Sequence, residues 1–192
     1  GAVKCWGWNE LGQLGDGTTT DRRTPTDVVG LTSGVLAIAI GGNHSCALTD
    51  AGAVKCWGAN EDGQVGDTTT TNRSRPGTVS GLESEVRALD AGLTSSCAVT
   101  MDGSVRCWGS NQWGQLGDGG TTDRSAPVGV VGLPAGVQDV TVGGTHACVL
   151  TDAGGLLCWG ANSSGQLGDR TTEKRQQPVP VARRSIPTRC GW

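Results

Sequence analysis

A repeat of 51 residues constrains the fold of this chain more than any other feature. A segment that begins Cys56-Trp57-Gly58-Ala59-Asn60 and continues Gly63-Gln64-Val65-Gly66-Asp67 recurs at a step of 51 residues. Its tryptophans are Trp6, Trp57, Trp108 and Trp159, and its Gly-Gln pairs begin at Gly12, Gly63, Gly114 and Gly165. Because no residue is inserted or deleted between the copies, the sequence predicts one supersecondary unit that is stacked repeatedly.

Each unit contains the strand signals of a four-stranded blade and no helical periodicity. Val35–Ile40 is apolar throughout, as expected of an inner strand that is buried on both faces. His44–Thr49 follows, and a hairpin returns the chain through residues 53–57. The outer strand contains a proline, whose missing N–H suits an edge strand, at Pro25, Pro76, Pro127 and Pro178. The predicted fold class is therefore all-β, with β-propeller-like blades of four antiparallel strands.

The chain is predicted to form a single repeat domain over residues 1–192. Residues 1–30 form a partial blade with only the third and fourth strands, and residues 31–81, 82–132 and 133–181 form complete blades. Residues 182–192 break the register, so we expect an aberrant tail that closes or extends the structure. Since the chain opens at Gly1, within a unit and without an initiator methionine, we also expect that a preceding segment was removed or left out. About four blades imply an incomplete ring, or one that another chain closes or extends.

Composition and charge exclude several classes of function. The chain has seven Trp, one Met, no Phe and no Tyr, so Trp must join Val, Leu and Ile in the core. The 15 basic and 18 acidic residues are spread along the chain and leave a net charge of −3. Without a basic stripe, nucleic acid is not expected as a partner. No apolar run approaches the ~20 residues that span a bilayer, so membrane insertion is not expected either.

Six of the eight cysteines form three pairs with one spacing, in which the second cysteine stands ten positions after the first. The pairs are Cys46–Cys56, Cys97–Cys107 and Cys148–Cys158. A turn near Gly52 would bring Cys46 opposite Cys56, with Cα atoms about 4.5–5.5 Å apart, which a disulfide can bridge. Zinc sites usually show the shorter C-x₂₋₄-C spacing. The pattern therefore predicts three disulfides and a secreted or extracellular, oxidising location.

Three segments of the unit resemble the regulator of chromosome condensation repeat family, in its secreted bacterial form. They are residues 41–49, residues 52–58 and residues 60–66, with their equivalents 51 residues away in either direction. Members of this family typically close seven blades. They include a nuclear nucleotide-exchange factor, a plant ultraviolet-B photoreceptor and a secreted bacterial β-lactamase inhibitor. This chain departs from that pattern, because its 192 residues hold nearly four units.

Two cysteines remain outside the three pairs. Cys5 lacks the partner that would stand ten residues upstream, and Cys190 lies in the aberrant tail. We therefore expect a Cys5–Cys190 disulfide in which the tail fills the gap beside the first strand. The bond could form within one chain and close a small ring, or between chains and join open pieces head to tail into a filament.

No motif of the chain predicts catalysis, a cofactor or a metal site. His44 and His146 precede their cysteines, but Ser95 replaces the histidine in the third unit, so we interpret them as structural residues that bond the backbone of a neighbouring blade. Asp16 and its equivalents supply one acid per loop, which favours an internal Asp–Arg bridge over calcium binding. Gly-x-Ser-x-Gly, P-loop and paired-carboxylate patterns are absent from the sequence.

The candidate binding residues lie in loops that a propeller would present on one rim. Two are tryptophans at positions where the other units have no aromatic residue, and aromatic side chains are frequent anchors of interfaces. The others are basic. The set is Trp8, Trp113, Arg22, Arg23, Arg73, Arg75 and Arg124.

These observations predict a secreted, non-catalytic interaction or assembly module whose partner is a protein, a glycan or another copy of itself. The alternative is an inhibitor or lectin-like binder that acts through the rim loops. Photoreception has less support, because the four tryptophans in register are expected in the core and no Trp-Arg cluster stands out. Nucleotide exchange in a nucleus conflicts with the predicted disulfides.

Overall fold

The computed structural model describes residues 1–182, which contain fourteen strands and no helix. They form one two-stranded and three four-stranded antiparallel sheets. The first blade is β1 (Lys4–Gly7) and β2 (Arg22–Asp27). The second is β3 (Val35–Ile40), β4 (His44–Thr49), β5 (Val54–Gly58) and β6 (Arg73–Thr78). The third is β7 (Val86–Ala91), β8 (Ser95–Thr100), β9 (Val105–Gly109) and β10 (Arg124–Gly129), and the fourth is β11 (Val137–Val142), β12 (His146–Thr151), β13 (Leu156–Gly160) and β14 (Arg175–Pro180).

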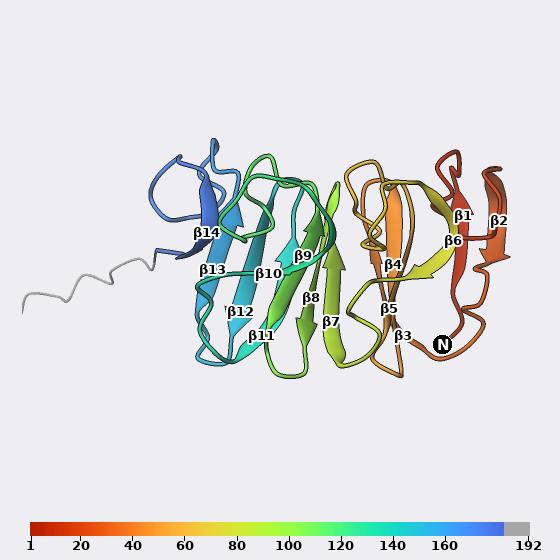
Figure 1. Cartoon of the computed structure of the whole chain (residues 1–192), viewed down its shortest axis with the longest axis horizontal. Helices are drawn as coiled ribbons and strands as arrows, with labels where there is room; N and C mark the ends of the chain where they lie inside the picture. The colour runs from red at the N-terminus through yellow and green to blue at the C-terminus, as the bar shows by residue number, and fades with distance from the viewer. Residues whose placement is uncertain (183–192) are drawn as a thin grey trace, which may run out of the picture.

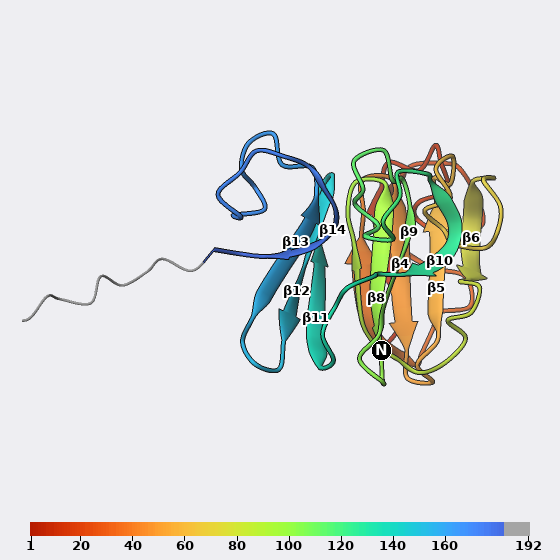
Figure 2. The same ribbon diagram turned by 60° about the vertical axis from the view of Figure 1, so that its left-hand side comes forward.

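Every complete blade runs from its first strand to its fourth in sequence order, and the chain then passes directly to the next blade. The blades follow one another along the long axis of the molecule, with β1 and β2 at one end and β14 at the other (Figure 1). β7 packs on β3 and β4, and β11 packs on β7 and β8. The turned view separates the fourth blade from the stack (Figure 2). The predicted all-β fold of propeller-like blades is confirmed.

The hydrophobic core lies in the seams between successive blades. One cluster joins Leu48 and Val54 of the second blade to Val86 and Trp108 of the third. The next joins Val105 of the third blade to Val149 and Trp159 of the fourth. A blade therefore buries the apolar face that another blade covers, as in other repeat architectures.

The inner strand β3 differs from the expectation of burial on both faces. Leu36, Ile38 and Ile40 are all exposed. At the equivalent positions of the fourth blade, Val140 and Val142 are buried because the third blade covers them. The first blade consists of β1 and β2 among the described residues, so it offers no inner strands to cover β3.

Each complete blade has a disulfide across its central hairpin. Cys46 pairs with Cys56 and Leu48 with Val54 in the β4–β5 register. The Cα atoms of Cys46 and Cys56 are 4.1 Å apart, as they are for Cys97–Cys107 and Cys148–Cys158. Cys5 forms no disulfide within residues 1–182, whereas Cys190 lies outside the described residues, so the Cys5–Cys190 pairing stays a prediction.

Candidate functional site

The repeated tryptophan is a hydrogen-bond donor that locks each seam. The indole Nε1 of Trp57 donates to the Gln13 carbonyl of the preceding blade at 2.9 Å. Trp108 donates to the Gln64 carbonyl at 2.9 Å, and Trp159 to the Gln115 carbonyl at 2.8 Å. A buried indole N–H requires such an acceptor. The Gln-containing loop of one blade therefore holds the tryptophan of the next.

The glycine two residues after each of these glutamines makes room for the indole ring. Gly66 has φ +77°, and a Cβ there would lie 2.7 Å from Trp108 Nε1. A side chain at this position would be strained by its backbone conformation and would also collide with the ring. This explains the repeated Gly-Gln-x-Gly sequence.

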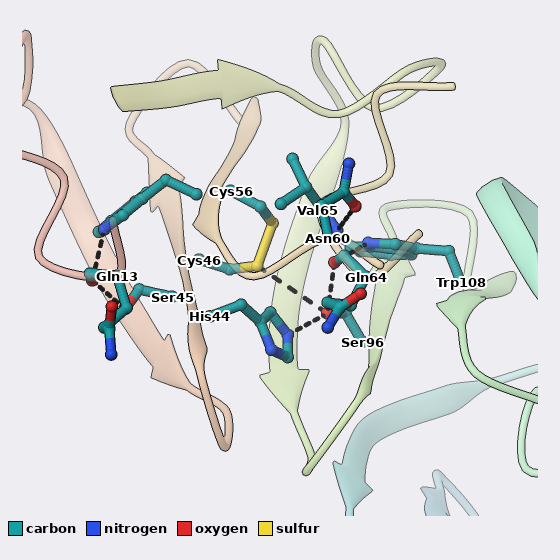
Figure 3. Close-up of a disulfide and its surroundings, with 11 residues drawn as sticks. Gln13, His44, Ser45, Cys46, Cys56, Asn60, Gln64, Val65, Ser96 and Trp108 are labelled. Atoms are coloured by element: carbon teal, nitrogen blue, oxygen red, sulfur yellow. Dashed lines mark hydrogen bonds between the residues drawn. A yellow bond between two sulfur atoms is a disulfide. The ribbon is translucent and has the colours of Figure 1, made fainter. Parts of the chain in front are cut away.

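A second contact crosses the seam between the second and third blades, where His44 of β4 points toward Ser96 of β8 (Figure 3). His44 Nε2 and Ser96 Oγ are 2.8 Å apart, and Ser96 Oγ donates to the Gln64 carbonyl at 3.2 Å. The serine proton is used on Gln64, so His44 must donate from Nε2, and its buried Nδ1 is left without a partner. The histidine therefore bonds a neighbouring hydroxyl, where we expected backbone.

The next seam shows why Ser95 replaces the histidine there. The positions equivalent to His44 and Ser96 are Ser95 and Ala147. Ala147 has no hydroxyl to accept the histidine N–H, and the buried Ser95 Oγ has no hydrogen-bond partner. Across these two seams, the histidine is present where the serine is present and absent where the serine is absent. This indicates that the two residues form a structural hydrogen-bonded pair.

This pair makes the free energy of unfolding depend on pH. Burial lowers the pKa of His44 from 6.5 to about 4. Between these values the unfolded chain binds the histidine proton and the folded chain does not, so we expect stability to fall as the pH decreases from 6.5 to 4 and to lose this dependence below 4. Urea unfolding at stepped pH measures the slope. His44→Gln, which can still donate to Ser96, should reduce the slope in this window, and an unchanged slope would contradict the prediction.

The rim loops are held by an Asn-Asp-Arg network that recurs in every unit. Asn9 Nδ2 donates to Asp16 Oδ1 at 3.3 Å, and its Oδ1 accepts the Leu14 N–H at 2.9 Å. Asp16 also accepts the Arg22 Nε–H at 2.6 Å. Burial alone would raise the pKa of Asp16, but the hydrogen bonds from Thr18 and Arg22 outweigh it and lower the pKa to about 2. The equivalent ion pairs are Asp67–Arg73, Asp118–Arg124 and Asp169–Arg175.

The structure divides the predicted rim residues into two groups. Arg22, Arg73 and Arg124 are engaged by the loop aspartates, as the predicted Asp–Arg bridge requires. Arg23 and Arg75 are exposed and make no ion pair within residues 1–182. The first group shapes the loops, and the second group forms none of these ion pairs.

The two predicted aromatic contacts are half-exposed but lie in different blades. Trp8 is 46% exposed and follows β1 in the first blade. Trp113 is 47% exposed and follows β9 in the third blade. They therefore belong to two surfaces: Trp113 to the rim, and Trp8 to the open edge described next.

The open edge is the uncovered side of the first blade. Trp6 on β1 is 60% exposed, whereas Trp57, Trp108 and Trp159 are at most 1% exposed. A pocket of 430 Å³ lies here. Its apolar lining comes from Cys5, Trp6, Trp8, Leu14, Ile38 and Ile40. Trp6 thus differs from the core position that we expected for all four tryptophans, because no blade covers it among residues 1–182.

The open edge also contains an unpaired strand. β1 pairs only with β2, while β5, β9 and β13 each pair with strands on both sides. Cys5 occupies on β1 the position that Cys56, Cys107 and Cys158 occupy in the other blades. Partial burial raises the pKa of the Cys5 thiol. An unpaired backbone edge beside an apolar pocket is a ready site for another β-strand.

Sequence reasoning singled out Trp8 and Cys5 at this site and missed Trp6, Ile38 and Ile40. The partial first blade was the available signal, since a strand pair without its inner strands must leave the next blade's inner face uncovered. The residues described by the structure contain no group of three His, Cys, Asp or Glu side chains that could hold a metal ion. Within the same residues no helix could span a membrane.

The stacked blades and their tryptophan-locked seams define a β-propeller repeat protein. The family model of the regulator of chromosome condensation (RCC1) repeat matches residues 1–48, 51–99, 102–150 and 153–191. The chain therefore belongs to the RCC1 repeat family, with four repeats.

Relatives with longer chains share the repeats. The chain is 33% identical to the ultraviolet-B receptor UVR8 of Arabidopsis thaliana over 92% of its own length and 41% of the receptor. It is 34% identical to the human probable E3 ubiquitin-protein ligase HERC4 over 93% of its length and 17% of the ligase. The chain thus spans less than half of these relatives.

Solved structures agree with this assignment. Human WBSCR16 superimposes with a TM-score of 0.85 at 28% identity, and the match covers 95% of this chain and 49% of that one. The yeast RCC1 protein Prp20, solved bound to Kap60, gives a TM-score of 0.81 at 22% identity over 96% of this chain and 45% of Prp20. At 22% identity the likeness to Prp20 concerns the fold alone.

Proposed function

We propose that this chain is a secreted, non-catalytic protein-interaction module that associates with further copies of itself through the open edge. The observation that carries the proposal is the exposure of Trp6, Ile38 and Ile40 at a face of the first two blades that no blade covers among residues 1–182. Where another blade stands in front of the same repeat positions, they are buried, or partly buried in the case of Leu89. The open edge is therefore complementary to a blade of this family.

The fourth blade offers the matching surface. Gln166 is the repeat equivalent of Gln13, Gln64 and Gln115, whose carbonyls accept the tryptophan N–H groups. The Gln166 carbonyl has no such donor among the described residues. The indole N–H of Trp6 from a second copy would supply this donor. The contact between the two copies would then have the same arrangement as the seams between blades within one chain. A heterologous joint of this kind builds a closed ring or a filament.

The disulfides support a secreted protein, since paired cysteines persist in oxidising compartments. We place it with the secreted bacterial members of the family. His44 bonds across a seam, and Asp16 and Arg22 bond each other within a loop. Because these polar groups already stabilise the fold, they support a module without catalysis.

Sedimentation velocity over a concentration series tests the self-association. We expect species heavier than the 19.5 kDa monomer to grow with concentration. The double variant Ile38→Asp/Ile40→Asp places two charges in the pocket and should shift the association to at least tenfold higher concentration. Met101→Asp is the matched control, because Met101 is also an exposed apolar residue but lies in the β8–β9 turn, away from the open edge. A monomer at every concentration would overturn the proposal.

A second candidate function is a rim-loop binder of protein or glycan, as in an inhibitor or a lectin. The exposed Trp113, with Arg23 and Arg75 free of ion pairs, favours it. Glycan arrays and enzyme-inhibition assays with Trp113→Ala and Arg75→Ala would test this function. Met101→Asp again serves as the control, and binding that survives both rim variants would contradict the rim as the contact surface.

A further inference from the structure

We propose that the third blade contains a binding pocket for a small aliphatic carboxylate, in which Arg106 binds the carboxylate and the linker after β10 packs against the aliphatic chain. The pocket has a volume of 390 Å³ and lies between the β8–β9 turn, the start of β9 and residues 129–135. This volume is within the range of about 300–1,000 Å³ that is usual for small-molecule sites. The pocket shares no residue with the open edge, so the inference goes beyond the proposed self-association.

Arg106 lacks the partner that the equivalent basic residues have. In the first two blades a lysine stands at this position and bonds the residue opposite it on the outer strand. The pairs are Lys4–Asp27 and Lys55–Thr78. Arg106 stands opposite Gly129, which has no side chain to accept its N–H groups. Within residues 1–182 the Arg106 guanidinium forms no ion pair and no hydrogen bond, so its five donors remain available to a ligand.

Nothing in the backbone requires a glycine at position 129. Its φ lies outside the left-handed region. A Cβ at Gly129 would meet no atom within 4 Å. The missing side chain therefore leaves open space beside Arg106, and both residues line the pocket.

The linker after β10 is also less tightly closed than the equivalent linker after β6. Leu82 donates its N–H to the Val79 carbonyl at 3.2 Å, accepts the Val54 N–H at 2.9 Å and is 1% exposed. Among residues 1–182 the backbone of Leu133 forms neither equivalent bond, and its side chain is only partly buried. Val130 is partly buried too, whereas Val79 is fully buried. The apolar side chains that close the second blade therefore line a hollow in the third.

The charges around Arg106 favour a single carboxylate over a phosphate. Asp102 also lines the pocket, and hydrogen bonds within its turn, first that from the Thr100 hydroxyl, lower the pKa of Asp102, so it stays ionised at neutral pH. Glu83 and Glu85 line an adjoining pocket that Asp102 and Arg106 share. Three carboxylates near one guanidinium repel a doubly charged anion more strongly than a singly charged one.

The remaining lining defines the other half of the ligand. Val130, Leu133 and Pro134 present apolar surface in the same pocket as the Arg106 guanidinium. A guanidinium binds a carboxylate through two parallel hydrogen bonds, and a short aliphatic chain would cover the apolar wall. Two sources present this chemistry, a free aliphatic acid and the C-terminal aliphatic residue of a peptide.

An NMR titration of the isotope-labelled whole chain with isocaproate tests the pocket. We expect saturable amide shifts confined to the β8–β9 turn, β9 and residues 129–135. Isocaproamide has the same chain without the charge and should bind at least tenfold more weakly to the same wild-type protein. Arg106→Gln should raise the Kd for isocaproate at least tenfold. Lys55→Gln is the matched control, because Lys55 is the equivalent residue of the second blade and already bonds Thr78, and it should change the Kd less than twofold.

Gly129→Asp tests the same pocket from the opposite strand. It gives Arg106 the partner that Asp27 gives Lys4, in space that a side chain can enter. We expect it to weaken isocaproate binding at least tenfold while the circular dichroism spectrum stays that of the wild type.

The tripeptide glycyl-glycyl-leucine distinguishes the two sources. Tighter binding than isocaproate would assign the pocket to peptide C-termini, and weaker binding would assign it to free acids, and both outcomes support a carboxylate site. The absence of saturable shifts with isocaproate would overturn the proposal. Equal affinity for isocaproate and its amide, or an unchanged Kd in Arg106→Gln, would overturn it as well.

Discussion

Replacing Trp108 by alanine is expected to lower the free energy of unfolding by about 3–5 kcal/mol, the usual cost of removing a large buried aromatic side chain. Trp108 is fully buried in the core that joins the second and third blades. The variant also removes the bond from its Nε1 to the Gln64 carbonyl. Urea unfolding followed by far-UV circular dichroism measures the loss without depending on tryptophan fluorescence.

Trp6→Ala is the matched control, because Trp6 occupies the same repeat position but is exposed. At low protein concentration we expect it to change the free energy of unfolding by less than about 1 kcal/mol. For Trp108→Phe we expect a loss in the free energy of unfolding between those of Trp6→Ala and Trp108→Ala, since phenylalanine keeps part of the buried ring and lacks the N–H. Equal losses for Trp6→Ala and Trp108→Ala would contradict the seam as the source of stability.

Reduction of the three disulfides is expected to unfold the chain or bring it close to unfolding. Each closes a loop with a sequence separation of 10, for which the chain-entropy model gives about 2–3 kcal/mol. Three such contributions approach the total stability of about 5–15 kcal/mol that is typical of a domain. Circular dichroism during titration with a reductant, with thiol counting at each step, follows the transition.

A paired variant separates one disulfide from the others. Cys97→Ala/Cys107→Ala should lower the urea midpoint by roughly a third of the effect of full reduction, while the other two blades keep their bonds. Cys5→Ala is the control, because Cys5 takes no part in a disulfide among the described residues. A fully reduced protein with an unchanged urea midpoint would contradict the structural role of these bonds.

The repeat allowed the blades to be predicted because glycines, tryptophans and cysteines mark the same structural positions in each unit. The hairpin register followed from the cysteine spacing, and the structure places Cys46 opposite Cys56. The Asp–Arg bridges followed from one acid and one arginine per loop, and the structure contains them in all four loops. Local spacing is sufficient for such contacts, since both partners belong to one unit.

Burial at the open edge could not be predicted in the same way. Trp6 and Trp57 stand in nearly identical local sequences, Cys-Trp-Gly, yet one is exposed and the other buried. The difference comes from whether another blade stands in front of the tryptophan, which the unit itself does not encode. The His44–Ser96 pair was missed for a related reason, since its members belong to two different blades.

Hydrogen exchange of β1 tests the proposed function most directly, namely that another copy covers the open edge. In dilute protein the β1 amides that face away from β2 should exchange much faster than those of β5, which has strands on both sides. At concentrations that produce oligomers, β1 should become as protected as β5, and β5 should not change. Protection of β1 that stays the same from the dilute monomer to the oligomer would contradict the claim.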